Sequence, residues 1–212
     1  MNRSWETPGI AGISGHLDVL HMTHLWRMRA GFDFAVSELH KLNLKSSHRI
    51  YLALRYGIPQ WVPMATRVLL RLSFDDLNAE DLNHLGYNVF EKIAKGKESV
   101  LQIRRSLAFY PPYPKVDDAP HCTHQERCKK TWFEVWGKEI FRLIHHPSNY
   151  LPLSSILITL KSVKHDGMHK TCKSFVISWM EESCPGLQKE ERAICQTVSS
   201  IQDMARIHML VD

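Results

Sequence analysis

The chain has 212 residues, of which 44% are hydrophobic and 23% are charged, and its formal net charge is +5. This composition is that of a globular protein able to bury its own core, and it excludes collagen-like, low-complexity and disulfide-rich scaffolds. No apolar stretch reaches the roughly 20 residues that cross a bilayer, and no apolar run near the start is typical of a secretory signal. We therefore expect an intracellular protein, cytoplasmic or nuclear, whose five cysteines are thiols or metal ligands.

Following a segment at 1–17 that we expect to be flexible, residues 18–110 form a predicted helical subdomain. Its clearest signal is an apolar stripe with the i, i+3, i+4, i+7 spacing of an amphipathic helix. The stripe consists of Trp61, Met64, Ala65, Val68, Leu69 and Leu72. Because a missing backbone N–H costs least at the start of a helix, Pro59 and Pro63 predict that this helix begins beside them.

A second and longer helix is predicted over 78–109. Asn78 is its expected N-cap, because an Asn side chain can accept a hydrogen bond from a free amide of the first turn. The acidic side chain of Asp81 in that turn is favoured by the helix dipole. Gly86 and Gly96 weaken the helix, so a bend or a break is predicted near them.

A proline-rich segment at 111–121 is the predicted linker between two halves of the chain. Pro111, Pro112 and Pro114 cannot continue a helix. Residues 122–212 then form a second predicted helical subdomain, with further apolar stripes at helical spacing. The stripes are Trp132, Trp136, Ile140, Leu143 and Ile144, then Cys172, Phe175, Val176, Trp179 and Met180, and finally Ile194, Val198, Ile201 and Ala205.

One short apolar stretch, 156–158, can be read either as a strand or as part of a helix. Elsewhere no run of residues alternates convincingly with the period of two that a half-buried strand requires. The sequence therefore predicts an all-α fold, an irregular multi-helix array in which two helical halves are joined by the proline-rich linker.

Cysteine and histidine residues gather at the starts of two predicted C-terminal helices. Cys122, His124 and Cys128 precede or begin the first of them, and His169 and Cys172 precede or begin the second. Zinc in structural sites takes four tetrahedral ligands from Cys and His, so four of these five residues could bind one structural zinc if the two helices lie side by side. The alternative interpretation is that the cysteines are ordinary core residues and the histidines are solvated.

Several short motifs in these helices resemble one protein family. The motifs are Arg55–Pro63 with the sequence RYGIPQWVP, Leu77–Gly86 with LNAEDLNHLG, and Lys92–Ala94 with KIA. With weaker likenesses at 19–39 and 122–179, they resemble the helical region that follows the BTB fold in fungal, basidiomycete-type BTB/POZ proteins. The resemblance covers about residues 18–205. The hundred or so residues of a BTB fold itself are expected to be absent, so the resemblance carries over neither its dimerisation nor its recruitment of ubiquitin ligases.

The resemblance implies a non-enzymatic, adaptor-like module that binds another protein, and the chain contains no catalytic motif that argues otherwise. We expect no small-molecule substrate, no membrane association and no cofactor besides the zinc. The surface predicted to bind the partner lies around Trp61 to Phe90. Cys184 is expected to be an exposed loop thiol, and Cys195 a helix residue beside the core.

Two other functions remain open at the level of sequence. The first is a zinc-supported nucleic-acid-binding or transcription-associated protein, whose basic residues would be Arg127, Lys129, Lys130 and Lys138. The second is an enzyme with a Cys/His nucleophile, which chance pairing among thirteen histidines and five cysteines can mimic. Scattered basic residues are more typical of solvated helix faces, so the interaction module is the preferred hypothesis.

Overall fold

The computed structural model describes residues 12–114, 122–145 and 153–211, and within these ranges every regular element is a helix. The α-helices are α1 (Gly12–Leu25), α2 (Arg29–Lys41), α3 (Ser46–Arg55), α4 (Val62–Arg71), α5 (Ala79–Phe109), α6 (Gln125–Val135), α7 (Phe141–His145), α8 (Leu153–Ser162), α9 (Lys170–Ser183) and α10 (Pro185–Val211). Two 3-10 turns, η1 (Pro59–Trp61) and η2 (Phe74–Asp76), and a π-helical turn, η4 (Trp136–Ile140), lie between them. The prediction of an all-α fold is confirmed, and 156–158 belongs to α8.

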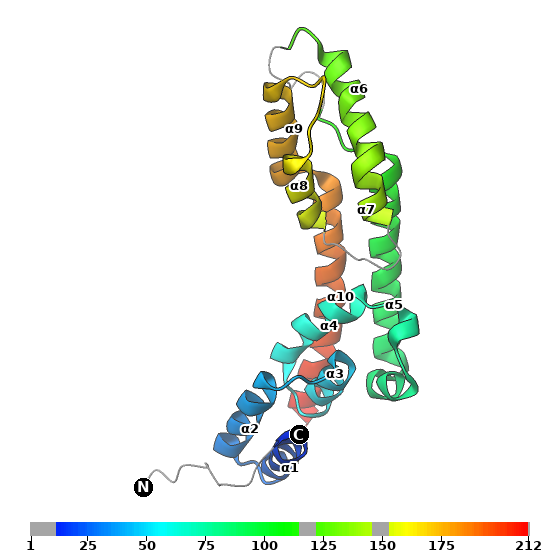
Figure 1. The fold of residues 1–212 in the computed structure, drawn as a ribbon. Helices are drawn as coiled ribbons and strands as arrows, with labels where there is room; N and C mark the ends of the chain where they lie inside the picture. Colours follow the sequence, from blue (N-terminus) through cyan, green and yellow to red (C-terminus); the bar gives the residue numbers. More distant parts are fainter. Residues whose placement is uncertain (1–11, 115–121, 146–152, 212) are drawn as a thin grey trace.

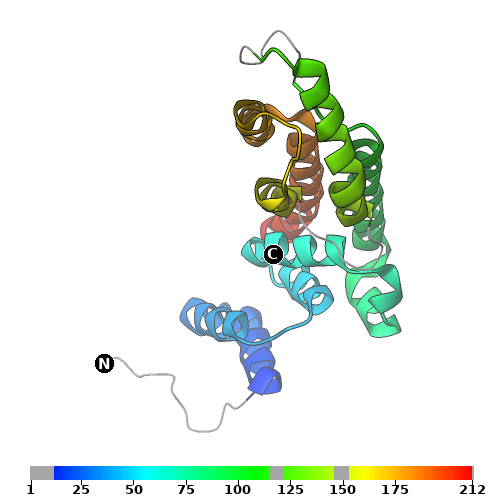
Figure 2. The same cartoon turned by 45° about the horizontal axis from the view of Figure 1, so that its top comes forward.

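Two hydrophobic cores lie along the length of the molecule, and the long helices α5 and α10 run through both (Figure 1, Figure 2). The first core contains residues of α1 to α4, and the second contains residues of α6 to α9. On α5, Val100 belongs to the first core and Leu107 to the second; on α10, Leu187 packs against the second core and Ile194 belongs to the first. The structure thus differs from the predicted division at 111–121, because α10 returns to the first core.

Local sequence signals explain the start and the bend of α5. Asn78 accepts a hydrogen bond from the amide of Asp81 at 2.9 Å, and the Asp81 carboxylate accepts one in return from the amide of Asn78 at 3.2 Å. Gly86 has a left-handed backbone (φ 63°, ψ 167°), which confirms the predicted bend. Gly96 does not break the helix. It lets α10 approach, because a Cβ there would come within 2.3 Å of the Thr197 hydroxyl oxygen.

Two predictions about the first half need correction. The predicted stripe of α4 is only partly buried, since Trp61, Ala65 and Leu69 belong to the first core while Met64 and Val68 are exposed. The segment at 1–17 is helical from residue 12 onward, and residues 1–11 lie outside the described part. Among the linker residues, 111–114 are described and 115–121 are not. Helical periodicity alone cannot show how wide a face the neighbouring helices cover.

A buried ion pair joins α5 and α10 at the junction of the two cores. The guanidinium Nε of Arg104 lies 2.8 Å from a carboxylate oxygen of Glu190, and the two side chains are only 4% and 7% exposed. On α5, Arg104 lies between Val100 of the first core and Leu107 of the second. Two charges removed from water are tolerated only when they are paired, so this contact fixes the register of α5 against α10.

Two tryptophans anchor the second core to the end of α5. The indole N–H of Trp132 donates to the carbonyl of Pro112 at 3.0 Å, and that of Trp136 donates to the carbonyl of Leu107 at 3.1 Å. Both side chains are buried, so these bonds satisfy the only polar atom of each ring. Together they hold α6 and η4 against the end of α5 and Pro112.

Candidate metal centre

Three cysteine sulfurs meet where α6 and α9 begin. The Sγ atoms of Cys122, Cys128 and Cys172 all lie within 4.8 Å of one another, and those of Cys122 and Cys128 are 3.8 Å apart. Figure 1 shows α6 and α9 starting at the same end of the molecule. Three converging thiols at this distance could hold a metal ion.

The helix starts explain both the convergence and the electrostatic character of the site. Cys128 lies in the first turn of α6, and Cys172 lies in the first turn of α9. Both positions therefore lie at the positive end of a helix dipole, which favours negative charge. Cys128 and Cys172 also belong to the second core and are buried, whereas Cys122, in the turn before α6, is partly exposed.

Backbone amides contribute further to the site. The amide of His169 donates to the sulfur of Cys128 at 3.4 Å. A hydrogen bond from the His124 backbone lowers the pKa of the Cys122 thiol. By contrast, burial, together with the two neighbouring thiols, raises the pKa of Cys172 to about 12. Three thiolates in this space would repel one another, and a coordinated cation removes that cost because it keeps its thiol ligands deprotonated.

The two predicted histidine ligands lie beside the cluster but do not complete it. Nδ1 of His124 is 2.9 Å from the hydroxyl of Thr123, and Nδ1 of His169 is 2.7 Å from the hydroxyl of Thr171. Both histidines are exposed, and neither belongs to the group of converging ligand atoms. Of the five candidate residues, the structure therefore brings together the three cysteines.

The other two cysteines, Cys184 and Cys195, lie outside the cluster, whereas Tyr113 lies near it. Cys184 was predicted to be an exposed loop thiol, and this is wrong: it lies between α9 and α10 and is buried in the second core. Cys195 is exposed on α10. Tyr113, which sequence reasoning missed, packs against the second core. Its pKa is raised by burial and by the nearby thiols of the cluster. The position of Tyr113 in a proline-rich segment gave no signal that its side chain would lie near the cysteines.

No known protein family, curated protein or solved structure matches this chain. Within the described residues, none of the helices combines the length and the apolar character that crossing a membrane requires. A metal ion held by the three cysteines would join the start of α6 to the start of α9.

Proposed function

We propose that this protein is a non-enzymatic, adaptor-like helical module that binds another protein, and that a structural zinc stabilises its C-terminal half. The observation that carries the interaction function is a group of exposed apolar side chains at the α1–α2 connection. Leu25 and Trp26 are 63% and 62% exposed, and Met28 beside them is also exposed. Contiguous exposed apolar side chains of this size are typical of protein interaction sites.

Zinc is the metal that fits the cysteine cluster best. Soft thiolate ligands select zinc over calcium or magnesium, and structural zinc sites are commonly built from three cysteines and one histidine. We propose His124 or His169 as the fourth ligand. Each lies at the N-cap of its helix, and the backbone amide of each already bonds to a cysteine sulfur of the cluster. The imidazole would bind after its ring leaves the neighbouring threonine.

The resemblance to the helical region of fungal BTB/POZ proteins supports the same class of function. The family-like segment Arg55–Pro63 covers the end of α3 and η1, and several of its residues line a surface pocket beneath the exposed apolar group. The exposed side chains of Leu25 and Met28 line the same pocket. For the nucleic-acid alternative, Arg127 and Lys130 are exposed on α6 and Lys138 on η4, while Lys129 is half-buried.

The interaction function predicts that Trp26→Ser abolishes capture of the specific partner from an extract of the native cells. The substitution should leave the fold intact, because the side chain is exposed and contributes little to either core. A matched control is Ile158→Ser on α8, whose side chain is 70% exposed. Quantitative mass spectrometry of the captured proteins reads out the difference.

Three outcomes would contradict the proposal. If every protein captured by the wild type is also captured by Trp26→Ser, the α1–α2 connection is not the binding surface. If capture depends instead on Tyr87, which is exposed on α5, the partner surface lies around Trp61 to Phe90 as the sequence predicted. Capture that falls steeply with salt and with nuclease treatment would favour nucleic-acid binding.

A further inference from the structure

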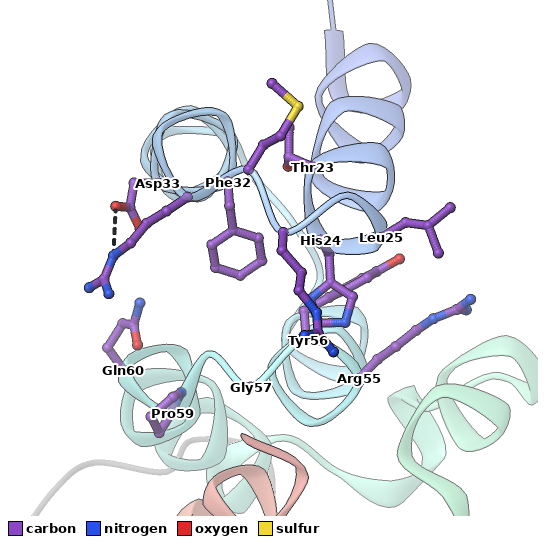
Figure 3. A pocket seen from close by; sticks show the side chains of 13 residues that line it. Thr23, His24, Leu25, Phe32, Asp33, Arg55, Tyr56, Gly57, Pro59 and Gln60 are labelled. Atoms are coloured by element: carbon purple, nitrogen blue, oxygen red, sulfur yellow. Dashed lines mark ion pairs between the residues drawn. The ribbon is translucent and has the colours of Figure 1, made fainter. Parts of the chain in front are cut away.

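A pocket of about 660 Å³ lies between the α1–α2 connection and the end of α3 (Figure 3). Its centre is aromatic: the Phe32 ring extends from α2 into the pocket, and the His24 ring lies 6.0 Å from that of Phe32 and 5.1 Å from that of Tyr56. Volumes of this size are typical of ligand sites. Because the rim is continuous with exposed Leu25, the apolar surface extends beyond what a small molecule would cover.

The rim of the pocket carries an excess of positive charge. It contains Arg27, Arg29 and Arg55, against one carboxylate, Asp33, which pairs with Arg29 at 3.7 Å. The three arginines come from two different sides of the pocket, the α1–α2 connection and α3. A site with this distribution attracts a partner that is acidic.

Arg55 is held against two tyrosine rings at the edge of the pocket. Its guanidinium lies over the rings of Tyr51 and Tyr56, 5.8 Å and 5.6 Å from their centroids, and it donates a hydrogen bond to the Tyr51 hydroxyl. Among the described residues, no carboxylate forms an ion pair with it. Stacking on aromatic rings limits the freedom of the side chain while its N–H groups remain available for a carboxylate.

Arg27 occupies a backbone position that usually belongs to glycine. Helix α1 ends in a Schellman motif, in which the amide of Arg27 bonds to the carbonyl of His24 at 3.1 Å and that of Met28 bonds to the carbonyl of Thr23 at 2.8 Å. The φ angle of Arg27 is 53°, the left-handed region in which a side chain is strained. Strain of this kind clusters at functional sites, so an arginine here indicates a role for its side chain in the pocket.

From these observations we infer that the pocket binds a segment of a partner protein that carries a bulky apolar side chain next to acidic residues. The apolar side chain contacts Phe32 and Tyr56, and the carboxylates pair with Arg27 and Arg55. This inference rests on the proposed interaction function and adds to it the chemistry of the partner and the location of its binding site.

The test uses the full chain and a phage-displayed library of random 16-residue peptides. An enriched peptide is synthesised with a fluorescent label, and its affinity is measured by anisotropy for the wild type, Arg27→Gly and Arg55→Gln. Arg142→Gln is the matched control, because Arg142 is an exposed arginine on α7 and its removal changes the net charge equally. The same peptide with Glu→Gln and Asp→Asn replacements tests the carboxylates directly.

We expect enrichment of peptides that combine Asp or Glu with Leu, Phe or Trp. Affinity should fall at least about tenfold in Arg27→Gly, in Arg55→Gln and with the amide peptide, and stay unchanged in Arg142→Gln. The Tm of Arg27→Gly should be unchanged or higher, because glycine removes the backbone strain. A loss of binding in a variant that folds at least as well cannot be attributed to unfolding.

Other results separate this inference from the proposed function. Enriched peptides that are apolar without acidic residues, and that lose binding in Trp26→Ser, would overturn the acidic partner while the interaction function stands. A concentration-dependent dimer that Arg27→Gly disperses would make the occupant a second copy of this chain and overturn the inference. If the library yields no ligand, the inference is also wrong, and the interaction function then depends on the Trp26→Ser capture experiment alone.

Discussion

Replacing Cys128 by serine is expected to abolish metal retention and to lower the Tm of the zinc-loaded protein by roughly 10 °C. Free zinc at about 1,000 times its dissociation constant stabilises a folded protein by about 4 kcal/mol. In a chain of this length each kcal/mol corresponds to about 2–4 °C. The effect should be concentrated in the second core, because Cys128 and Cys172 link α6 to α9 there. Thermal unfolding followed by circular dichroism, with and without a strong chelator, measures it.

Cys184→Ser is the matched control for this experiment. Cys184 is as deeply buried as Cys128 and lies in the same core, but it is outside the cluster. It should lose some stability through packing yet keep its zinc and its sensitivity to chelator. If chelator leaves the Tm of the wild type unchanged, or if Cys184→Ser loses metal as Cys128→Ser does, the cluster is not a structural zinc site.

Arg104→Met is expected to lower the free energy of unfolding by about 3–5 kcal/mol. The substitution removes the guanidinium that pairs with the buried carboxylate of Glu190, and breaking a buried ion pair by removing one member is costly. Removing both charges, in Arg104→Met with Glu190→Leu, should restore much of the loss. Urea unfolding at neutral pH provides the free energies.

An exposed ion pair within α5 is the control, because its N–O distance is similar to that of the Arg104–Glu190 pair but its side chains are not buried. Lys95 and Glu91 are 2.6 Å apart on α5, but their side chains are 75% and 41% exposed. Lys95→Met should therefore leave the free energy of unfolding nearly unchanged, because water screens an exposed pair. Equal effects of Arg104→Met and Lys95→Met, or a double variant no more stable than Arg104→Met, would show that the buried pair does not hold α5 against α10.

Local signals in the sequence predicted the all-α fold and the start and bend of α5. The cap at Asn78 and the bend at Gly86 were predictable because each involves residues only a few positions apart. The packing of α10 along α5, by contrast, depends on contacts between residues far apart in the sequence, such as Arg104 with Glu190, which are 86 positions apart. Periodicity could not reveal this, since it describes one helix at a time.

Part of the candidate metal site could likewise be predicted from the sequence and part could not. The sequence could predict that Cys128 and Cys172 lie at helix starts, because local signals show where those helices begin. The structure brings both residues into one cluster with Cys122. The orientation of the His124 and His169 rings is decided by hydroxyl neighbours one or two residues away, which ligand spacing does not describe.

The pocket at the α1–α2 connection had no sequence signal. Its left-handed residue is an arginine, where glycine or asparagine would have marked the helix end. Its aromatic centre also comes from three separate elements, because His24, Phe32 and Tyr56 meet only when α1 to α3 pack together. A site of this kind becomes visible only once the tertiary structure is known.

The most direct test of the zinc-stabilised module is the metal itself, in full-length protein purified without added metal. Native mass spectrometry gives the stoichiometry, and X-ray absorption at the zinc edge gives the ligands. We predict one zinc per chain with three sulfur ligands at about 2.3 Å and one nitrogen at about 2.0–2.1 Å. The nitrogen ligand should be lost in one of the two variants His124→Gln and His169→Gln, which identifies the fourth ligand. A metal-free protein, or zinc bound without sulfur, would contradict the account.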